Sequence, residues 1–302
     1  MRNFINLSDI DKRELRKIID HAKSQKQKGS TIKTDVPLVG KTLIMIFEKP
    51  STRTRLSFEL AMKKLGGDVL VLNPKESHYG SGDESIHDTA KILSQYGDVV
   101  MMRTNKHEHF LEFSKHLEIP IINGLTNLSH PVQIMATVMT YEELRGSIAN
   151  KKIAWLGDGN NVVYSLIEAS VQFNFELAIA CPQQLTPNKK ILKWAKSKKA
   201  KILITKDPLE AAHLADCVMT DKWVSMGDKG NKNKKKKLLK SYQVNKKIMK
   251  SAKADAVFMH CLPANRGEEV TDEVMDGKQS VVWLEALNRV HAQKSIIEWC
   301  LK

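Results

Sequence analysis

Short apolar runs alternate with segments of helical spacing along almost the whole chain, and this alternation limits the possible folds more than any other feature. In the first part of the chain, the predicted strands are residues 42–47, 68–72, 99–103 and 119–123, and the predicted helices between them are residues 52–65, 84–96 and 108–116. Strands separated by helices in this way form parallel sheets that are covered by helices. The sequence therefore predicts an α/β fold.

A long helix predicted at residues 131–144 separates this series from a second one. Pro131 suits the first turn of a helix, where its missing N–H costs nothing, and Gly146 suits the end. In the second series the predicted strands are residues 152–156, 177–180, 201–205, 217–220, 256–259 and 280–283, and the predicted helices are residues 162–173, 188–198, 209–213, 244–250, 272–275 and 285–301. The chain thus repeats the alternating layout.

Two such series predict two doubly wound parallel-sheet domains with an active-site cleft between them. We expect the first domain at residues 1–131 and the second at residues 132–283. A C-terminal helix at about residues 284–302 is expected to pack back on the first domain. A further helix is expected at residues 7–28, with Ser8 as its N-cap.

The net charge of +14 is concentrated in one segment rather than spread over the fold. Residues 222–253 contain twelve lysines and a single acidic residue, Asp228, so they carry +11 of that charge. Because no arginine and few aromatic residues are interleaved there, we interpret the lysine run at residues 232–237 as a solvated loop and do not expect nucleic-acid binding.

The sequence also favours a cytoplasmic protein. The longest apolar runs fall far short of the roughly 20 residues that a membrane-spanning helix needs, and the N-terminal residues lack the apolar stretch of a secretory signal. The cysteines are scattered, with neither metal-ligand nor disulfide spacing, as is usual in a reducing compartment. They are Cys181, Cys217, Cys261 and Cys300.

The segment Phe47–Arg55 predicts an anion site where the first strand ends and a helix begins. Ser51 suits the N-cap, and the first helical turn adds the hydroxyl groups of Thr52 and Thr54 and the guanidinium of Arg53. Free backbone N–H groups and the positive end of the helix dipole make such a place suitable for a phosphate. Arg53 and Arg55 point to roughly opposite sides of a helix, so only one of them can face the anion. The alternative is a capped helix with two surface arginines.

Other polar groups follow the carboxyl ends of other predicted strands, where parallel sheets bind their ligands. They are Arg103, the turn at residues 158–161, Asp221 and the segment at residues 260–263. Each has a simpler interpretation. The turn after residue 156 lacks the third glycine of a dinucleotide site and more readily places Asn160 or Asn161 over the cleft. His130 and Gln133, three residues apart, could cap a helix, Asp221 could lie in a surface loop, and Cys261 could be a small buried apolar residue.

In combination and in order, these motifs resemble those of the aspartate/ornithine carbamoyltransferase family over about residues 7–301. Residues 47–55 match the carbamoyl-phosphate motif of the family, and residues 130–133 match its second motif. Residues 221–227 (Asp-Lys-Trp-Val-Ser-Met-Gly) and 260–263 (His-Cys-Leu-Pro) match signatures of the ornithine branch, which the aspartate branch lacks in this form.

The resemblance implies a reaction and a set of site residues. Carbamoyl phosphate and L-ornithine would give L-citrulline and phosphate, as in arginine biosynthesis or urea-type metabolism. The resemblance implies no metal or redox cofactor, and it implies a homotrimer. The implied carbamoyl-phosphate ligands are Ser51, Thr52, Arg53, Thr54, Tyr79, Arg103, His130, Gln133, Cys261, Leu262 and Arg289. The implied ornithine ligands are Asn161, Asp221, Ser225 and Met226, and the implied catalytic residues are Arg103, His130 and Cys261.

Two positions depart from the family pattern. Tyr79 stands where many members have a glutamine that reaches the phosphate, and Leu287 replaces a glutamate two residues before Arg289. Three alternative functions stay open at this point: carbamoyl transfer to N-acetylornithine, putrescine or aspartate, an NAD-linked oxidoreductase, and a nucleic-acid-binding module. Asp221 favours an acceptor with a free α-ammonium over an acetylated one.

Overall fold

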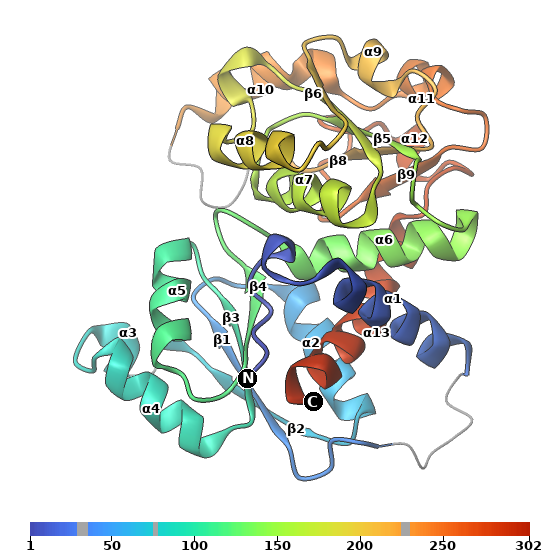
Figure 1. The fold of residues 1–302 in the computed structure, drawn as a ribbon. Coiled ribbons are helices and arrows are strands. Elements are labelled where there is room, and N and C mark those ends of the chain that lie inside the picture. The colour runs from blue at the N-terminus through green and yellow to red at the C-terminus, as the bar shows by residue number, and fades with distance from the viewer. Residues whose placement is uncertain (29–35, 75–77, 225–229) are drawn as a thin grey trace. The chain divides into compact units, whose positions relative to one another are not determined.

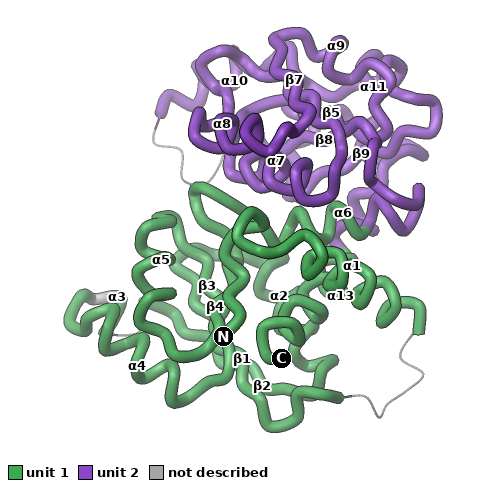
Figure 2. Tube along the Cα trace, in the orientation of Figure 1, with its two compact units in different colours: residues 1–139, 287–302 green, residues 140–286 purple. Residues whose placement is uncertain are grey.

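The computed structural model describes residues 1–28, 36–74, 78–224 and 230–302 (Figure 1). The chain forms two compact α/β units (Figure 2). Unit 1 comprises residues 1–139 and 287–302, and unit 2 comprises residues 140–286. The chain passes from one unit to the other within helix α6 (Pro131–Arg145) and returns within helix α13 (Val282–Leu301). The predicted fold class, two parallel-sheet domains flanked by helices, is confirmed.

Unit 1 is built on a parallel sheet with the strand order β2-β1-β3-β4. Its strands are β1 (Thr42–Phe47), β2 (Asp68–Leu72), β3 (Val99–Arg103) and β4 (Ile121–Leu125). Its helices are α1 (Lys12–Gln27), α2 (Thr52–Lys64), α3 (His78–Ser81), α4 (Ile86–Tyr96) and α5 (His107–His116), with parts of α6 and α13. Figure 1 shows α4 and α5 on one face of the sheet and α2 on the other. The strand order reverses between β1 and β3, and an open α/β sheet binds its ligands at such a reversal.

Unit 2 repeats this plan with five parallel strands in the order β7-β6-β5-β8-β9. They are β5 (Lys152–Leu156), β6 (Glu176–Ala180), β7 (Ile202–Thr205), β8 (Cys217–Thr220) and β9 (Val257–His260). The helices are α7 (Asn161–Phe173), α8 (Lys189–Ser197), α9 (Pro208–Ala212), α10 (Lys232–Leu239), α11 (Lys246–Ser251) and α12 (Asp272–Met275). Here the order reverses between β5 and β8, so the loops after these strands mark the expected ligand position.

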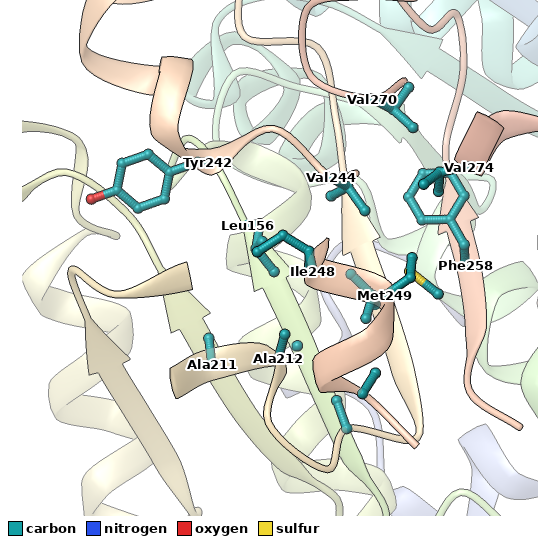
Figure 3. Packing of buried hydrophobic residues seen from close by; sticks show 14 of the residues in the cluster. Leu156, Ala211, Ala212, Tyr242, Val244, Ile248, Met249, Phe258, Val270 and Val274 are labelled. Atoms are coloured by element: carbon teal, nitrogen blue, oxygen red, sulfur yellow. The ribbon is translucent and has the colours of Figure 1, made fainter. Parts of the chain in front are cut away.

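An apolar cluster packs α11 and the segments around it against the sheet of unit 2 (Figure 3). Leu156 and Phe258 come from β5 and β9, and Ile248 and Met249 come from α11. Burial of each such side chain contributes roughly 1.5–3 kcal/mol to folding. The carboxyl ends of the strands, where the candidate site residues lie, are therefore held on a closely packed base.

The N-terminal helix begins later than predicted. α1 begins at Lys12, and the carboxylate of Asp11 caps it by accepting the N–H of Arg13 at 2.8 Å. Ser8 lies instead in a short 3-10 turn, where its hydroxyl donates to the carboxylate of Asp9. Asp11 caps the helix in place of Ser8 because Ser8 lies within the preceding 3-10 turn, whereas Asp11 directly precedes α1.

Two strand predictions also need correction. The strand predicted at residues 280–283 is wrong, because Ser280 makes only a single bridge to Phe258 and α13 begins at Val282. The last strand of unit 1 lies two residues later than predicted. Pro120 accounts for this shift, since proline has no N–H to donate to the sheet.

The lysine run is a helix, not a solvated loop. Asn231 caps α10 by accepting the N–H of Lys234, and Leu239 at the other end is fully buried in the unit 2 core. Lys235 pairs with Asp158, and Lys236 pairs with Glu268. The composition of the segment did not predict this helix, because few of its residues are buried and the acids that pair with its lysines lie elsewhere in the sequence.

Among the described residues, no helix combines the length and the apolar character required to cross a bilayer.

Candidate active site

The N-terminus of α2 forms one half of the candidate site. Ser51 occupies the N-cap position with an extended backbone, as predicted, but its hydroxyl makes no capping hydrogen bond within the described part of the chain. The first N–H groups of any helix have no acceptor within the helix. This hydroxyl and these N–H groups therefore suit an anion, with Thr52 exposed in the first turn.

Thr54 joins two arginines that are far apart in the sequence. Its buried hydroxyl oxygen accepts from Nη1 of Arg103 at 3.0 Å and from Nη2 of Arg289 at 2.8 Å. Arg103 ends β3, and the pairing of β3 with β4 shifts in register at this point, because Met102 pairs with Asn123 and Arg103 with Leu125. Arg289 comes from α13 and is itself buried. Two guanidinium groups thus converge on the first turn of α2.

His130 is buried beside these cations. Desolvation, and then the charges of Arg289, Arg103 and Arg53, hold the pKa of its imidazole well below the usual value. The ring is therefore neutral at physiological pH and can donate a hydrogen bond without carrying a charge. Gln133, also buried, follows three residues later on α6, so the predicted pair of ring and amide lies in unit 1 with the arginines.

Arg53 and Arg55 lie in different surroundings, as the helix geometry predicts. Arg53 is half-buried, and its charge acts on His130. Arg55 is exposed and lines a pocket of about 340 Å³ together with Phe47 and Val71. Of the two arginines, Arg53 is therefore the one beside the cluster of His130, Arg103 and Arg289.

In unit 2, Asp221 connects three loops at the carboxyl end of the sheet. Its Oδ1 accepts from Sγ of Cys261 at 2.9 Å, and its Oδ2 accepts from Nδ2 of Asn160 at 2.9 Å. Asn160 also caps α7, because its Oδ1 accepts the N–H groups of Val162 and Val163. The loops after β5, β8 and β9 are thereby joined around a single carboxylate.

His260 sets the conformation of the residues after β9. Its Nδ1 accepts the N–H of Leu262 at 2.8 Å, so a neutral ring carries its proton on Nε2, which lies 3.3 Å from Oε1 of Glu269. Leu262 has φ +57°, a left-handed conformation that branched residues seldom adopt. A second acid, Glu285, accepts the backbone N–H of His260. The hydrogen bond between its N–H and His260 thus helps to fix Leu262 in an uncommon backbone conformation.

Two family models match this chain. One is "Aspartate/ornithine carbamoyltransferase, carbamoyl-P binding domain", over residues 2–143, and the other is "Aspartate/ornithine carbamoyltransferase, Asp/Orn binding domain", over residues 149–300. The chain belongs to the aspartate/ornithine carbamoyltransferase family.

Known members of this carbamoyltransferase family resemble the chain over its full length. The ornithine carbamoyltransferase of Nitrobacter winogradskyi is 51% identical over 301 residues, which cover 99% of this chain and 97% of that protein. The structure of ornithine carbamoyltransferase from Pyrococcus furiosus matches with a TM-score of 0.93 and 43% identity, covering 98% of this chain and 96% of that one. The anabolic ornithine carbamoyltransferase of Campylobacter jejuni matches with a TM-score of 0.92 and 37% identity, and the match covers 99% of each chain.

Tyr79 marks one of the two places where the chain departs from the carbamoyltransferase pattern. Its hydroxyl donates to Oε1 of Glu48 at 2.9 Å, and the same oxygen lies 2.9 Å from Nδ1 of His109. Thr104 donates to the other oxygen of Glu48. Burial, and then the charge of Glu48, raise the pKa of Tyr79. The hydroxyl also lies 3.1 Å from Nε2 of His109, so its described contacts are with Glu48 and His109. Its role as a phosphate ligand stays a prediction.

Some implied residues of the carbamoyltransferase site are placed less fully. Asn161 is the first residue of α7 and is half-buried. Leu287, at the other departure from the family pattern, is exposed. Ser225 and Met226 lie outside the described residues.

A metal is not favoured at the carboxyl end of the unit 2 sheet. Ligand atoms of Asp221, His260 and Cys261 all lie within 4.8 Å of one another. However, Nδ1 of His260 already accepts an N–H, and Nε2 faces Glu269. The imidazole therefore has no nitrogen available for a metal in this arrangement.

Several residues that hold the site segments in place were not predicted from the sequence. Glu48, Glu269 and Lys235 each fix a segment that carries an implied ligand. The position of Glu48 inside the first motif was a possible signal. Glu269 and Lys235 had none, because their partners are brought close only by the fold.

Proposed function

We propose that the chain transfers the carbamoyl group of carbamoyl phosphate to the δ-amine of L-ornithine, giving L-citrulline and phosphate. The observation that carries this proposal is the carboxylate of Asp221, which faces Cys261 and Asn160 in a family whose other branch uses aspartate. A carboxylate attracts the α-ammonium of ornithine and repels the side-chain carboxylate of aspartate. It therefore favours a cationic amino acid as the acceptor.

The first half of the proposed reaction takes place at the cations of unit 1. The N-terminus of α2 and the guanidinium groups of Arg53, Arg103 and Arg289 suit the phosphate dianion. The same charges stabilise inorganic phosphate as it leaves. Neutral His130 and Arg103 donate to the carbamoyl oxygen, and Gln133 contacts the carbamoyl amide.

The chemical step is an acyl transfer. The lone pair of the δ-amine attacks the carbamoyl carbon, the carbonyl oxygen takes up negative charge, and the bond from carbon to the phosphate oxygen then breaks. Each preorganised donor to that oxygen lowers the barrier by roughly 3–4 kcal/mol, if it compares with measured oxyanion donors. As citrulline forms, the attacking nitrogen loses a proton, which the departing phosphate or water takes up.

Residues of unit 2 hold the acceptor in this proposal. Asp221 pairs with the α-ammonium, and Asn161 binds near the α-carboxylate, as do Ser225 and Met226. Cys261 and the carbonyl of Leu262 lie beside the reacting groups. The δ-amine must be neutral to attack, whereas a free alkylammonium titrates near ~10.4. The rate should therefore rise toward alkaline pH.

An assay of citrulline formation tests the proposal. Carbamoyl phosphate is supplied with L-ornithine, N-acetylornithine, putrescine or aspartate in parallel, and the carbamoylated product is measured. We expect product from ornithine and much less from the other three amines. Product from another amine without any from ornithine would overturn the proposal in favour of a different carbamoyl acceptor.

We also propose a homotrimer in the cytoplasm with a role in arginine biosynthesis. The anabolic ornithine carbamoyltransferase of Campylobacter jejuni, which matches over 99% of both chains, supports the biosynthetic direction. Light scattering checks the assembly, since the trimer has the mass of three chains. A monomeric mass at assay concentrations would contradict it.

A further inference from the structure

A half-buried ion pair connects the lysine-rich helix α10 to the turn that precedes Asn161, a proposed ornithine ligand. Nζ of Lys235 on α10 lies 2.6 Å from Oδ2 of Asp158. Only 17% of the lysine side chain and 14% of the aspartate side chain are exposed. Pairs exposed to water contribute little, but a pair withdrawn from water is strongly destabilised when one partner is removed.

The four consecutive lysines of α10 are not equivalent. Lys234 and Lys237 are exposed, whereas Lys235 and Lys236 are half-buried and paired with acids. A solvated lysine run would show no such division. Residues 234 and 237 are three apart and lie on the same side of the helix. The chain therefore offers two exposed lysines that carry the same charge as Lys235 but do not take part in the pair with Asp158.

Asp158 belongs to the turn that presents Asn160 and Asn161. The turn is held closely at several points. The indole of Trp155 donates to the carbonyl of Asp158 at 3.0 Å, and the N–H of Gly159 donates to the carbonyl of Leu185 at 2.8 Å. A Cβ added at residue 159 would come within 2.5 Å of that same carbonyl oxygen, so the backbone has little room to move.

The end of the turn contacts a proposed ornithine ligand, Asp221. Asn160 donates to Asp221, which in turn accepts from Cys261. A continuous series of contacts thus runs from the ammonium of Lys235 to the thiol of Cys261, all within unit 2.

We propose that Lys235 is a positioning residue for ornithine, acting through Asp158 on the turn that carries Asn160 and Asn161. This inference rests on the proposed function. Without the ammonium, the carboxylate of Asp158 loses its ion pair with Lys235 and can change its position. When the carboxylate moves, the turn moves with it, and Asp221 loses the well-placed amide donor of Asn160. The cations of unit 1 are unaffected, so carbamoyl phosphate binding should not change.

Steady-state kinetics of Lys235→Met give the main test. We expect KM for ornithine to rise about tenfold, equivalent to some 1.4 kcal/mol, with KM for carbamoyl phosphate and kcat changed much less. Lys235→Arg, which keeps the charge, should restore most of the wild-type KM. Lys234→Met and Lys237→Met are the matched controls, because each removes one charge from the exposed face of the same helix.

The double variant Asp158→Asn/Lys235→Met separates positioning from a general loss of charge. Removing the carboxylate that has lost its ammonium partner should recover part of the ornithine affinity lost in Lys235→Met. Equal KM values for Lys235→Met and the two control variants would overturn the inference, as would a rise in KM for carbamoyl phosphate of the same size.

Hydrogen exchange makes the inference testable without any activity. The backbone amides of residues 157–163 should exchange faster in Lys235→Met than in Lys234→Met. If wild-type enzyme forms no citrulline, the proposed function fails, but this measurement still shows whether Lys235 holds the turn at Asp158 in place. If the wild type is active and exchange is unchanged, only the role of Lys235 fails.

Discussion

The thiol of Cys261 donates a hydrogen bond to the carboxylate of Asp221, with 2.9 Å between Sγ and Oδ1. A carboxylate in this position stabilises the protonated sulfur and opposes the formation of a thiolate beside it. The free enzyme is thus expected to hold Cys261 as a thiol. Binding of an ammonium group at Asp221 would weaken this effect, so arrival of the amino acid and activation of the cysteine are coupled.

Alkylation of cysteine by iodoacetamide tests this relationship. Cys261 is half-buried, whereas the other three cysteines are buried, and burial raises the pKa of Cys181, for example, to about 11. We expect one modified thiol per native chain, at Cys261. Asp221→Asn should increase its rate of modification roughly three- to tenfold, because the negative charge that opposes a thiolate beside it is lost. Peptide mass mapping locates the modified residue, and Cys261→Ala is the control. A slower reaction in Asp221→Asn would contradict the prediction.

The two arginines of the first motif should differ sharply in function. Arg53 lies with His130, Arg103 and Arg289, whereas Arg55 is exposed. Arg53→Ala should lower kcat/KM for carbamoyl phosphate by roughly a hundredfold, as expected when a charged hydrogen-bonding partner is lost. Arg55→Ala should change it less than about threefold, like most surface substitutions. Equal effects in the two variants would show that the anion contacts the other side of the helix.

Those predictions show what a sequence can reveal of such a site. The position of Ser51 and the opposite directions of Arg53 and Arg55 follow from local helix geometry, which needs only the spacing of residues. The pairing of Thr54 with Arg289 does not, since 235 residues separate them. Spacing shows which face of a helix a residue occupies, but only packing determines what lies opposite.

The same limit explains the lysine-rich segment. Composition gave the correct net charge for residues 232–237 but the wrong structure, because neither Asp158 nor Glu268 is near them in the sequence. The strand predicted at residues 280–283 failed for a related reason. An apolar run of that length suits a strand and the start of a buried helix equally well, and here the helix α13 begins within it.

Tyr79→Phe distinguishes a structural role of this residue from phosphate binding. The hydroxyl donates to Glu48, so its loss should lower the free energy of unfolding by about 1.5–3 kcal/mol, the usual range for a hydrogen bond to a charged group. Because the hydroxyl donates to Glu48 and not to the ligand in this structural role, KM for carbamoyl phosphate should change less than about twofold. Chemical denaturation and steady-state kinetics on the same preparation give both values. A large rise in KM with unchanged stability would instead support the phosphate ligand implied by the family resemblance.

His130 should make the protein less stable in acid. Desolvation and three nearby arginines hold its pKa well below the usual value in the folded state, whereas the unfolded chain takes up a proton near pH ~6.5. Below that pH the unfolded state binds one more proton at this residue, so the free energy of unfolding falls as the pH falls. The slope from this one group approaches about 1.4 kcal/mol per pH unit. His130→Gln removes it, and the stability of this variant should therefore depend less on pH between 5 and 6.5. Guanidinium unfolding at several pH values measures the slopes, with His213→Gln, which removes an exposed imidazole, as the control for losing a histidine. A slope for His130→Gln as steep as that of the wild type would mean that His130 takes up its proton at a similar pH in the folded and unfolded states, and would contradict the prediction.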